Sequence, residues 1–185
     1  MALFDPHAEV SEMETSPNNI YLLLAEAFCY PVPGHLDALE KELDSLKGSS
    51  EKQSIAAFVE EIRHLSLGEW EELYTRTLDL NPPTAPYIGY QIWGESYQRG
   101  IFLSKMNQEL MKTGVDSQGE LPDHLIPVLR YLGQAPKPLP ELVEVLDRAF
   151  ERMVARLCKV DSGNPYLFLL KAVQSLCKDL RKEPA

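Results

Sequence analysis

Cysteine is scarce in this sequence, and its spacing excludes the usual cysteine-based sites. Cys29, Cys158 and Cys177 are odd in number and far apart, so they predict neither a disulfide framework nor a CxxC pair for a metal or a redox reaction. Because free thiols persist in reducing surroundings, we expect the protein to be cytoplasmic.

Long hydrophobic runs are absent as well. No stretch of about 18 apolar residues is present to span a bilayer. The acidic stretch 1–15 lacks the basic and apolar regions of a secretory signal. We therefore expect no direct membrane insertion, a flexible N-terminus over residues 1–15, and a single domain over residues 16–185.

Patterns that indicate catalysis are also missing. The chain contains neither GxxxxGK[ST] nor GxGxxG for phosphate binding, and it has no HExxH motif. Its histidines, His7, His35, His64 and His124, fall in separate predicted elements, which disfavours a zinc site. No nucleophile with a neighbouring base can be read from the spacing. We predict that the protein is not an enzyme and has no metal or other cofactor.

Basic residues are few in the N-terminal part of the chain. The formal net charge is −10; residues 1–79 hold 16 acidic against 5 basic residues, whereas residues 80–185 hold 12 against 13. A field of this sign repels nucleic acid and attracts basic peptides. Acidic helix faces that only keep the protein soluble are the alternative interpretation. We expect no nucleic-acid partner.

Apolar residues recur at helical spacing along almost the whole chain. No segment alternates as a strand does, and no repeat of 20 to 50 residues is visible. The pattern predicts an all-α, single-domain bundle of about eight helices. Typical stripes are formed by Ile20, Leu23, Leu24, Ala27 and Phe28, and by Ile55, Phe58, Val59 and Ile62.

Several helix ends can also be predicted. Ser16 suits an N-cap, and Ser66 with Glu69 forms a capping-box pattern. A long helix is predicted from about 91 to 112, ending at Gly114.

The segment 115–121 contains Gly119 and is a candidate hinge. Pro122 then stands where a proline opens a helix. Asp123 and His124 would lie in its first turn, where an acid is favoured by free backbone N–H groups. The preference for such residues at a helix N-terminus is enough to explain Asp123 and His124 here. The functional alternative is that Asp123 accepts from an incoming arginine or backbone while His124 stacks or donates.

Residues 72–90 end an amphipathic helix at Asp79 and continue into a loop with three prolines. Such a loop loses little entropy when a partner docks on it. Asp79 is unfavourable at a helix C-terminus, so Arg76 or Arg99 could compensate it, or it could face a ligand. The aromatic residues around this loop suit either the core or a peptide; they are Tyr74, Tyr87, Tyr90, Trp93 and Tyr97.

Three stretches in this region resemble the NarJ/TorD/DmsD family of redox enzyme maturation chaperones. LYTRTLDL, YIGYQIWG and ELPDHLIPVLRYL occur in order between Leu73 and Leu132, and together they are closest to the nitrate reductase delta-subunit (NarJ) type. The chain departs from that type at Ser96 and Tyr97, and at Arg130, where an acid is common. These departures concern which oxidoreductase such a chaperone would serve, its client.

The resemblance implies a TorD-like helical chaperone that is not an enzyme. Its partner would be the N-terminal leader, twin-arginine or vestigial, of a molybdopterin-containing catalytic subunit, held until the cofactor is inserted. A permanent helical subunit of an oxidoreductase complex is the alternative, and homodimer formation is left open. Carried over to this sequence, the peptide-binding residues are Tyr74, Asp79, Pro82, Pro83, Tyr87, Pro122, Asp123 and His124.

Overall fold

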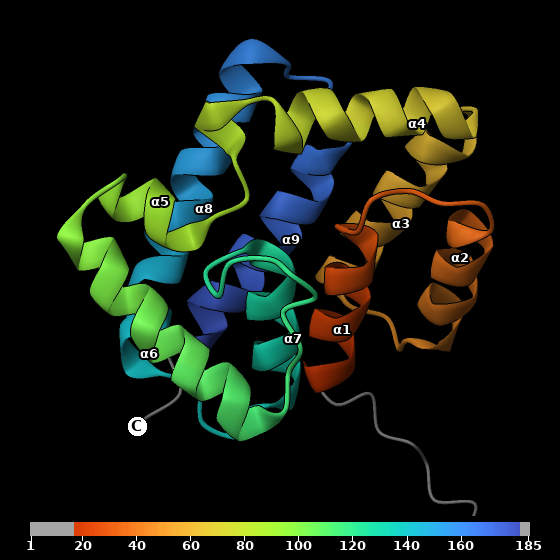
Figure 1. The fold of residues 1–185 in the computed structure, drawn as a ribbon. Coiled ribbons are helices and arrows are strands. Elements are labelled where there is room, and N and C mark those ends of the chain that lie inside the picture. Colours follow the sequence, from red (N-terminus) through yellow and green to blue (C-terminus); the bar gives the residue numbers. More distant parts are fainter. Residues whose placement is uncertain (1–16, 182–185) are drawn as a thin grey trace, which may run out of the picture.

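The computed structural model describes residues 17–181. The predicted flexible N-terminus and the Ser16 cap lie outside this range. The described residues form nine α-helices with a π-helical turn, η1, and a 3-10 turn, η2 (Figure 1). In chain order these are α1 Pro17–Ala27, α2 His35–Ser45, α3 Ser50–Arg63, α4 Leu67–Tyr74, η1 Thr75–Asp79, η2 Pro82–Thr84, α5 Ile88–Trp93, α6 Tyr97–Thr113, α7 Leu125–Gln134, α8 Pro140–Val160 and α9 Tyr166–Leu180.

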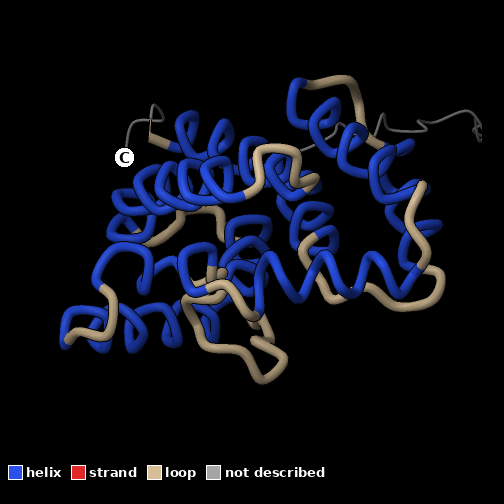
Figure 2. The backbone as a smooth tube through the Cα atoms, turned by 90° about the horizontal axis from the view of Figure 1, so that it is seen from above, coloured by secondary structure: helices blue, strands red, loops and turns tan. Residues whose placement is uncertain are grey.

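The all-α prediction is confirmed. Figure 2 shows helices joined by loops, and residues 17–181 contain one isolated β-bridge but no strand. None of the helices in this range is both long and apolar enough to cross a membrane.

The core lies between helices that are distant in the sequence. α9 packs against α3 and α8, and α7 lies between α1 and α6 (Figure 1). An aromatic group joins these layers, because the Phe58 ring lies 5.1 Å from Tyr166 and 6.4 Å from Trp70. The indole N–H of Trp70 donates to the Tyr166 hydroxyl at 3.1 Å, which satisfies both buried polar groups.

Two predicted helix ends are found where the sequence placed them. The Ser66 side chain accepts from the Glu69 amide, and the Glu69 carboxylate accepts from the Ser66 amide at 2.7 Å, so the capping box before α4 is complete. Gly114 ends α6 in the left-handed conformation, with φ 71°.

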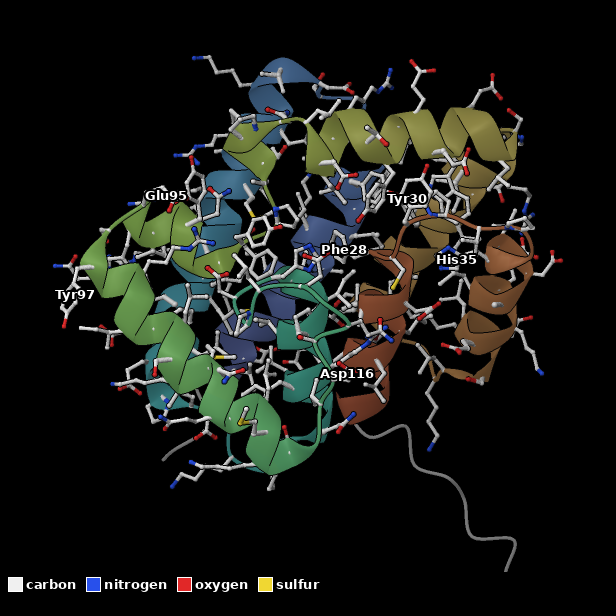
Figure 3. The ribbon with its side chains drawn as sticks, in the orientation of Figure 1. Phe28, Tyr30, His35, Glu95, Tyr97 and Asp116 are labelled. Carbon is white, nitrogen blue, oxygen red and sulfur yellow. The ribbon has the colours of Figure 1, made fainter. Side chains whose placement is uncertain are left out.

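The predicted continuous helix from 91 to 112 is wrong, because the chain breaks between α5 and α6. Gly94 adopts φ 59° and ψ −148°, a conformation that side chains disfavour. The break turns Tyr97 outward to 81% exposure, and Figure 3 shows it pointing away from the fold beside Glu95. Trp93 instead packs on Phe102, with ring centroids 5.1 Å apart.

Pro122 does not open a helix either. The His124 amide donates to the Leu121 carbonyl at 2.9 Å, so Pro122 and Asp123 occupy the middle of a four-residue turn. α7 begins only at Leu125, with His124 as its N-cap. Asp123 and His124 therefore precede the first turn of α7, and their predicted position inside that turn is wrong.

Candidate functional site

The proline loop is held in place by buried polar side chains. The Thr84 hydroxyl donates to the carbonyl of Thr77, and the Asn164 amide donates to the Thr77 hydroxyl at 2.9 Å. The Gln91 amide donates to the Ala85 carbonyl at 2.8 Å. These bonds fix the loop where α4 ends in the π-helical turn, a feature that often marks functional positions.

The two proline-bearing segments meet in space. Tyr87 and His124 form the isolated antiparallel bridge. The Ile88 amide donates to the Asp123 carbonyl at 2.8 Å, and the Leu125 amide donates to the Pro86 carbonyl at 2.7 Å. Segments about 35 residues apart in the chain thus share one short backbone pairing.

Asp123 is buried against a partner from its own chain. Its side chain is fully buried, and it accepts from Arg99 through Nε at 2.9 Å and Nη2 at 3.2 Å. The guanidinium also lies 5.6 Å from the Tyr87 ring centroid and 5.5 Å from that of Tyr90. Arg99 therefore occupies the place that the functional alternative gave to an incoming arginine, and it does not make an ion pair with Asp79. Asp123 joins α6 to the turn before α7.

Gly89 gives this ion pair its space. A Cβ at that position would lie 2.7 Å from Oδ2 of Asp123 and 3.2 Å from Cγ of Arg99. Both distances are shorter than ordinary carbon contacts, so any side chain here displaces the carboxylate. The glycine in the YIGY stretch is thus required by packing around Asp123.

His124 is a neutral cap in this arrangement. Its Nδ1 accepts from the Ile126 amide at 3.3 Å, and its ring lies edge-on to Tyr87 with centroids 5.1 Å apart. Burial lowers the pKa of His124 to about 4, against the weaker opposite effect of the Asp123 charge. The imidazole is therefore neutral near pH 7.

Asp79 and Glu120 are two acids that make no ion pair with the described residues, and we call them the acidic pair. Asp79 is exposed, and its pKa is raised first by partial burial and then by the negative charge of Glu120. Glu120 accepts from the Tyr87 hydroxyl at 3.4 Å. Within residues 17–181, neither carboxylate makes an ion pair.

Aromatic and apolar groups surround the acidic pair. Tyr74 is buried and packs edge-on against Tyr30, with centroids 5.2 Å apart. Tyr30 is 46% exposed and lies beneath α4 (Figure 3). Burial raises the pKa of Tyr74, with the charge of Asp79 as the next cause. We call the following group the acidic-aromatic surface: Tyr30, Tyr74, Asp79, Leu80, Tyr87, Glu120 and Leu121.

The structure separates the predicted site residues into three groups. Tyr74, Asp79 and Tyr87 belong to the acidic-aromatic surface. Pro122, Asp123 and His124 form the turn behind it. Pro82 and Pro83 are exposed and line a different cleft, toward α8.

Sequence reasoning missed Tyr30 and Glu120, and it considered Arg99 as a partner of Asp79 where the structure pairs Arg99 with Asp123. Glu120 had a signal, since it opens the ELPDHL stretch. Tyr30 is placed by tertiary contacts.

Comparison with known proteins supports one feature, the fold. A crystal structure of a protein from Archaeoglobus fulgidus, provisionally described as a redox enzyme maturation protein, matches with a TM-score of 0.66 at 16% sequence identity. The match covers 92% of this chain and 99% of that chain. The two proteins share a fold. No protein-family model and no curated protein sequence matches the chain.

No group of three or more histidine, cysteine or acidic side chains in the described residues is placed to hold a metal ion. The site thus consists of a fixed backbone, a neutralised ion pair and an exposed pair of acids. Exposed carboxylates beside aromatic rings are groups that occur where proteins bind cationic, partly apolar chains.

Proposed function

We propose that this protein is a maturation chaperone that binds the basic N-terminal leader of a molybdoenzyme catalytic subunit. The leader, of twin-arginine or vestigial type, is held in the cytoplasm until the molybdenum cofactor is inserted and the subunit is assembled. The fold shared with the Archaeoglobus protein supports the general role. The LYTRTLDL, YIGYQIWG and ELPDHL stretches favour a nitrate reductase or a related enzyme as the client.

The proposal rests on one observation, the acidic pair. Both acids are exposed, Glu120 accepts from the Tyr87 hydroxyl at 3.4 Å, and its charge is the second cause, after burial, of the raised pKa of Asp79. Two neighbouring carboxylates repel each other unless a cation lies between them. Since no cation of the described residues does so, the pair favours a lysine or arginine from another chain.

The rings beside the pair suit the apolar part of a leader. Tyr30 is half exposed, and Leu80 and Leu121 are 76% and 46% exposed. Tyr30 packs on Tyr74, and Leu80 and Leu121 directly follow Asp79 and Glu120 in the chain. Burying a few such groups contributes about 1.5 to 3 kcal/mol each before ordering costs. Micromolar affinity needs about 8 kcal/mol, so a few anchors and one or two ionic contacts suffice.

The residues behind the surface have a positioning role in this proposal. Asp123 and His124 set the backbone pairing that carries Tyr87, and Pro82, Pro83 and Pro122 restrict the loops. The segment 115–121 carries Glu120, so a hinge there would move one acid away from the other. Such a movement gives a route to release of the leader.

Calorimetry with a synthetic leader peptide tests the site. The double variant Asp79→Asn/Glu120→Gln should bind a leader containing two arginines about tenfold more weakly, since two partly exposed ionic contacts together contribute about 1.4 kcal/mol. Glu42→Gln/Asp44→Asn on α2 changes the net charge equally and should bind as the wild type does. Equal affinity of all three proteins would refute the acidic pair as the site.

Purification from the native host separates a chaperone from a permanent subunit. A chaperone should be recovered with the cofactor-free precursor and be absent from the mature enzyme. Stoichiometric recovery with the mature, cofactor-loaded enzyme would instead show that the protein is a structural subunit.

A further inference from the structure

A second cleft lies on the other side of the proline loop. Its volume is about 650 Å³, within the range of ligand sites. The proline loop, the end of α5 and the end of α8 form its walls. No carboxylate is among the described residues that line it, which are Pro82, Pro83, Tyr90, Gln91, Ile92, Gly94, Arg152, Arg156, Lys159 and Val160.

Two of the cations in this cleft are oriented by backbone carbonyls. Arg152 donates through Nη1 to the carbonyls of Gln91 and Ile92, at 2.5 and 3.4 Å. Arg156 donates through Nη1 to the Gln91 side-chain oxygen at 2.6 Å and to the Pro83 carbonyl at 3.3 Å. Carbonyl groups orient a guanidinium without cancelling its charge. In both arginines, Nε and Nη2 make no hydrogen bond with the described residues and can donate to a ligand.

The positive charge continues along α8 beyond the cleft. Arg148 lies one turn before Arg152, and Lys159 follows Arg156 in the last turn. Both are exposed and make no ion pair with the described residues. The four cations extend over about 16 Å of helix. α8 also exposes Glu144 and Glu151, but among the described residues neither makes an ion pair with these cations. The row of four cations is thus unpaired by carboxylates of the described residues in a protein whose net charge is −10.

We propose that this cleft and the exposed face of α8 bind an acidic peptide segment of a partner protein. Carboxylates repeated along a chain match cations repeated along a helix, and arginine forks bind carboxylates in pairs. Tyr90, Pro82 and Pro83 provide a wall for the apolar groups between the acids.

The geometry is less suited to a compact phosphate ligand. Phosphate sites commonly use backbone N–H groups at a helix N-terminus or a glycine-rich loop. Here α5 and α8 both point their C-terminal ends at the cleft, and the backbone presents the carbonyls of Gln91 and Ile92. These carbonyls repel a multiply charged anion placed among them.

This site differs from the proposed leader site in charge and in position. The acidic-aromatic surface attracts a basic segment, whereas the α8 cleft attracts an acidic one. The two proposals therefore fail separately, because the charge changes that test one leave the other unaltered.

Fluorescence anisotropy with a labelled 12-residue peptide tests the proposal. The peptide carries glutamate at every fourth position among alanine and leucine, and its reference has glutamine in place of glutamate. The wild type should bind the glutamate peptide at least tenfold more tightly than the glutamine peptide. Arg148→Glu/Lys159→Glu should remove this preference, and neither residue has an ion-pair partner among the described residues whose loss would unfold the protein. Circular dichroism melting checks that this variant, and the control variant described next, are folded.

The matched control is Lys171→Glu/Lys178→Glu on α9. Both lysines are exposed and without an ion pair among the described residues, so this variant has the same net charge and should keep the preference. Equal loss in the control, or no preference in the wild type up to 1 mM protein, would overturn the proposal. Displacement of the peptide by pyrophosphate but not by sulfate at equal ionic strength would also overturn it, in favour of a phosphate site.

Discussion

Replacing Gly89 by alanine should destabilise the protein although the position is helical. In an ordinary helix, glycine to alanine stabilises by about 0.5 to 1 kcal/mol. At Gly89 the new methyl group would lie 2.7 Å from Oδ2 of Asp123 and 3.1 Å from Cδ1 of Phe102. The carboxylate cannot simply move away, because the side chain of Asp123 is fully buried and its backbone is held by the Ile88 amide, which donates to the Asp123 carbonyl at 2.8 Å.

The expected magnitude follows from two opposing effects. Overpacking costs about 1 to 3 kcal/mol, and disturbing a buried ion pair costs up to about 3 to 5 kcal/mol. The gain in helix propensity offsets at most about 1 kcal/mol. We therefore expect Gly89→Ala to lower the free energy of unfolding by about 2 to 4 kcal/mol, which lowers Tm by about 5 to 15 °C for a chain of this size.

Urea denaturation followed by circular dichroism measures this change, with Gly100→Ala as the control. Gly100 lies in α6, is exposed, and has nothing within 4 Å of an added Cβ, so its replacement should stabilise the protein slightly. Repeating Gly89→Ala in an Asp123→Ala background should reduce its cost, since the closest atom is then gone. If Gly89→Ala is as stable as Gly100→Ala, the close approach of Asp123 to α5 is incorrect.

Three further predictions follow from the same region and from the core. Because the pKa of His124 is lowered to about 4 in the folded state, protonation of this side chain favours unfolding. The stabilisation by neutral His124 is fully present above pH 6.5, and the unfolding free energy falls by about 3 kcal/mol as the pH is lowered toward 4. His124→Asn keeps an N-cap and should remove this part of the pH dependence in urea titrations at pH 7 and 4.5. Asp123→Asn should lower the unfolding free energy by about 3 kcal/mol through the loss of the Arg99 pair, and an unchanged urea midpoint would contradict the buried pair. Tyr166→Phe should cost about 1 to 3 kcal/mol, because the buried Trp70 N–H loses its acceptor, whereas a wild-type Tm would show that water replaces it.

Most of the helices could be predicted because local patterns determine them. Apolar spacing indicates the buried faces, and end signals such as Ser66 with Glu69 need only neighbouring residues. The break at Gly94 was missed because Trp93, Tyr97 and Ile101 imitate the spacing of one continuous helix. A glycine followed two residues later by Ser96 was the available signal for a stop and a new start.

The candidate site was less predictable because its charges are paired through tertiary contacts. The meeting of the two proline-bearing segments depends on a backbone pairing between Tyr87 and His124, which no local pattern indicates. That Asp123 would be neutralised could not be inferred, since Arg99 lies 24 residues earlier in the chain. Glu120 was recognised as part of a stretch, yet its position beside Asp79 depends on the turn that precedes α7.

The pairing of Arg99 bears on the proposed attraction of a cation to the acidic-aromatic surface. Arg99 contacts both Asp123 and Glu95, the latter at 3.1 Å, so its charge is compensated by carboxylates of its own region. Were Asp123 absent, the guanidinium beneath Tyr87 would be free to attract Glu120, whose carboxylate already accepts from the Tyr87 hydroxyl. The buried aspartate therefore binds the guanidinium that lies over the Tyr87 ring. Among the described residues, Asp79 and Glu120 make no ion pair of their own.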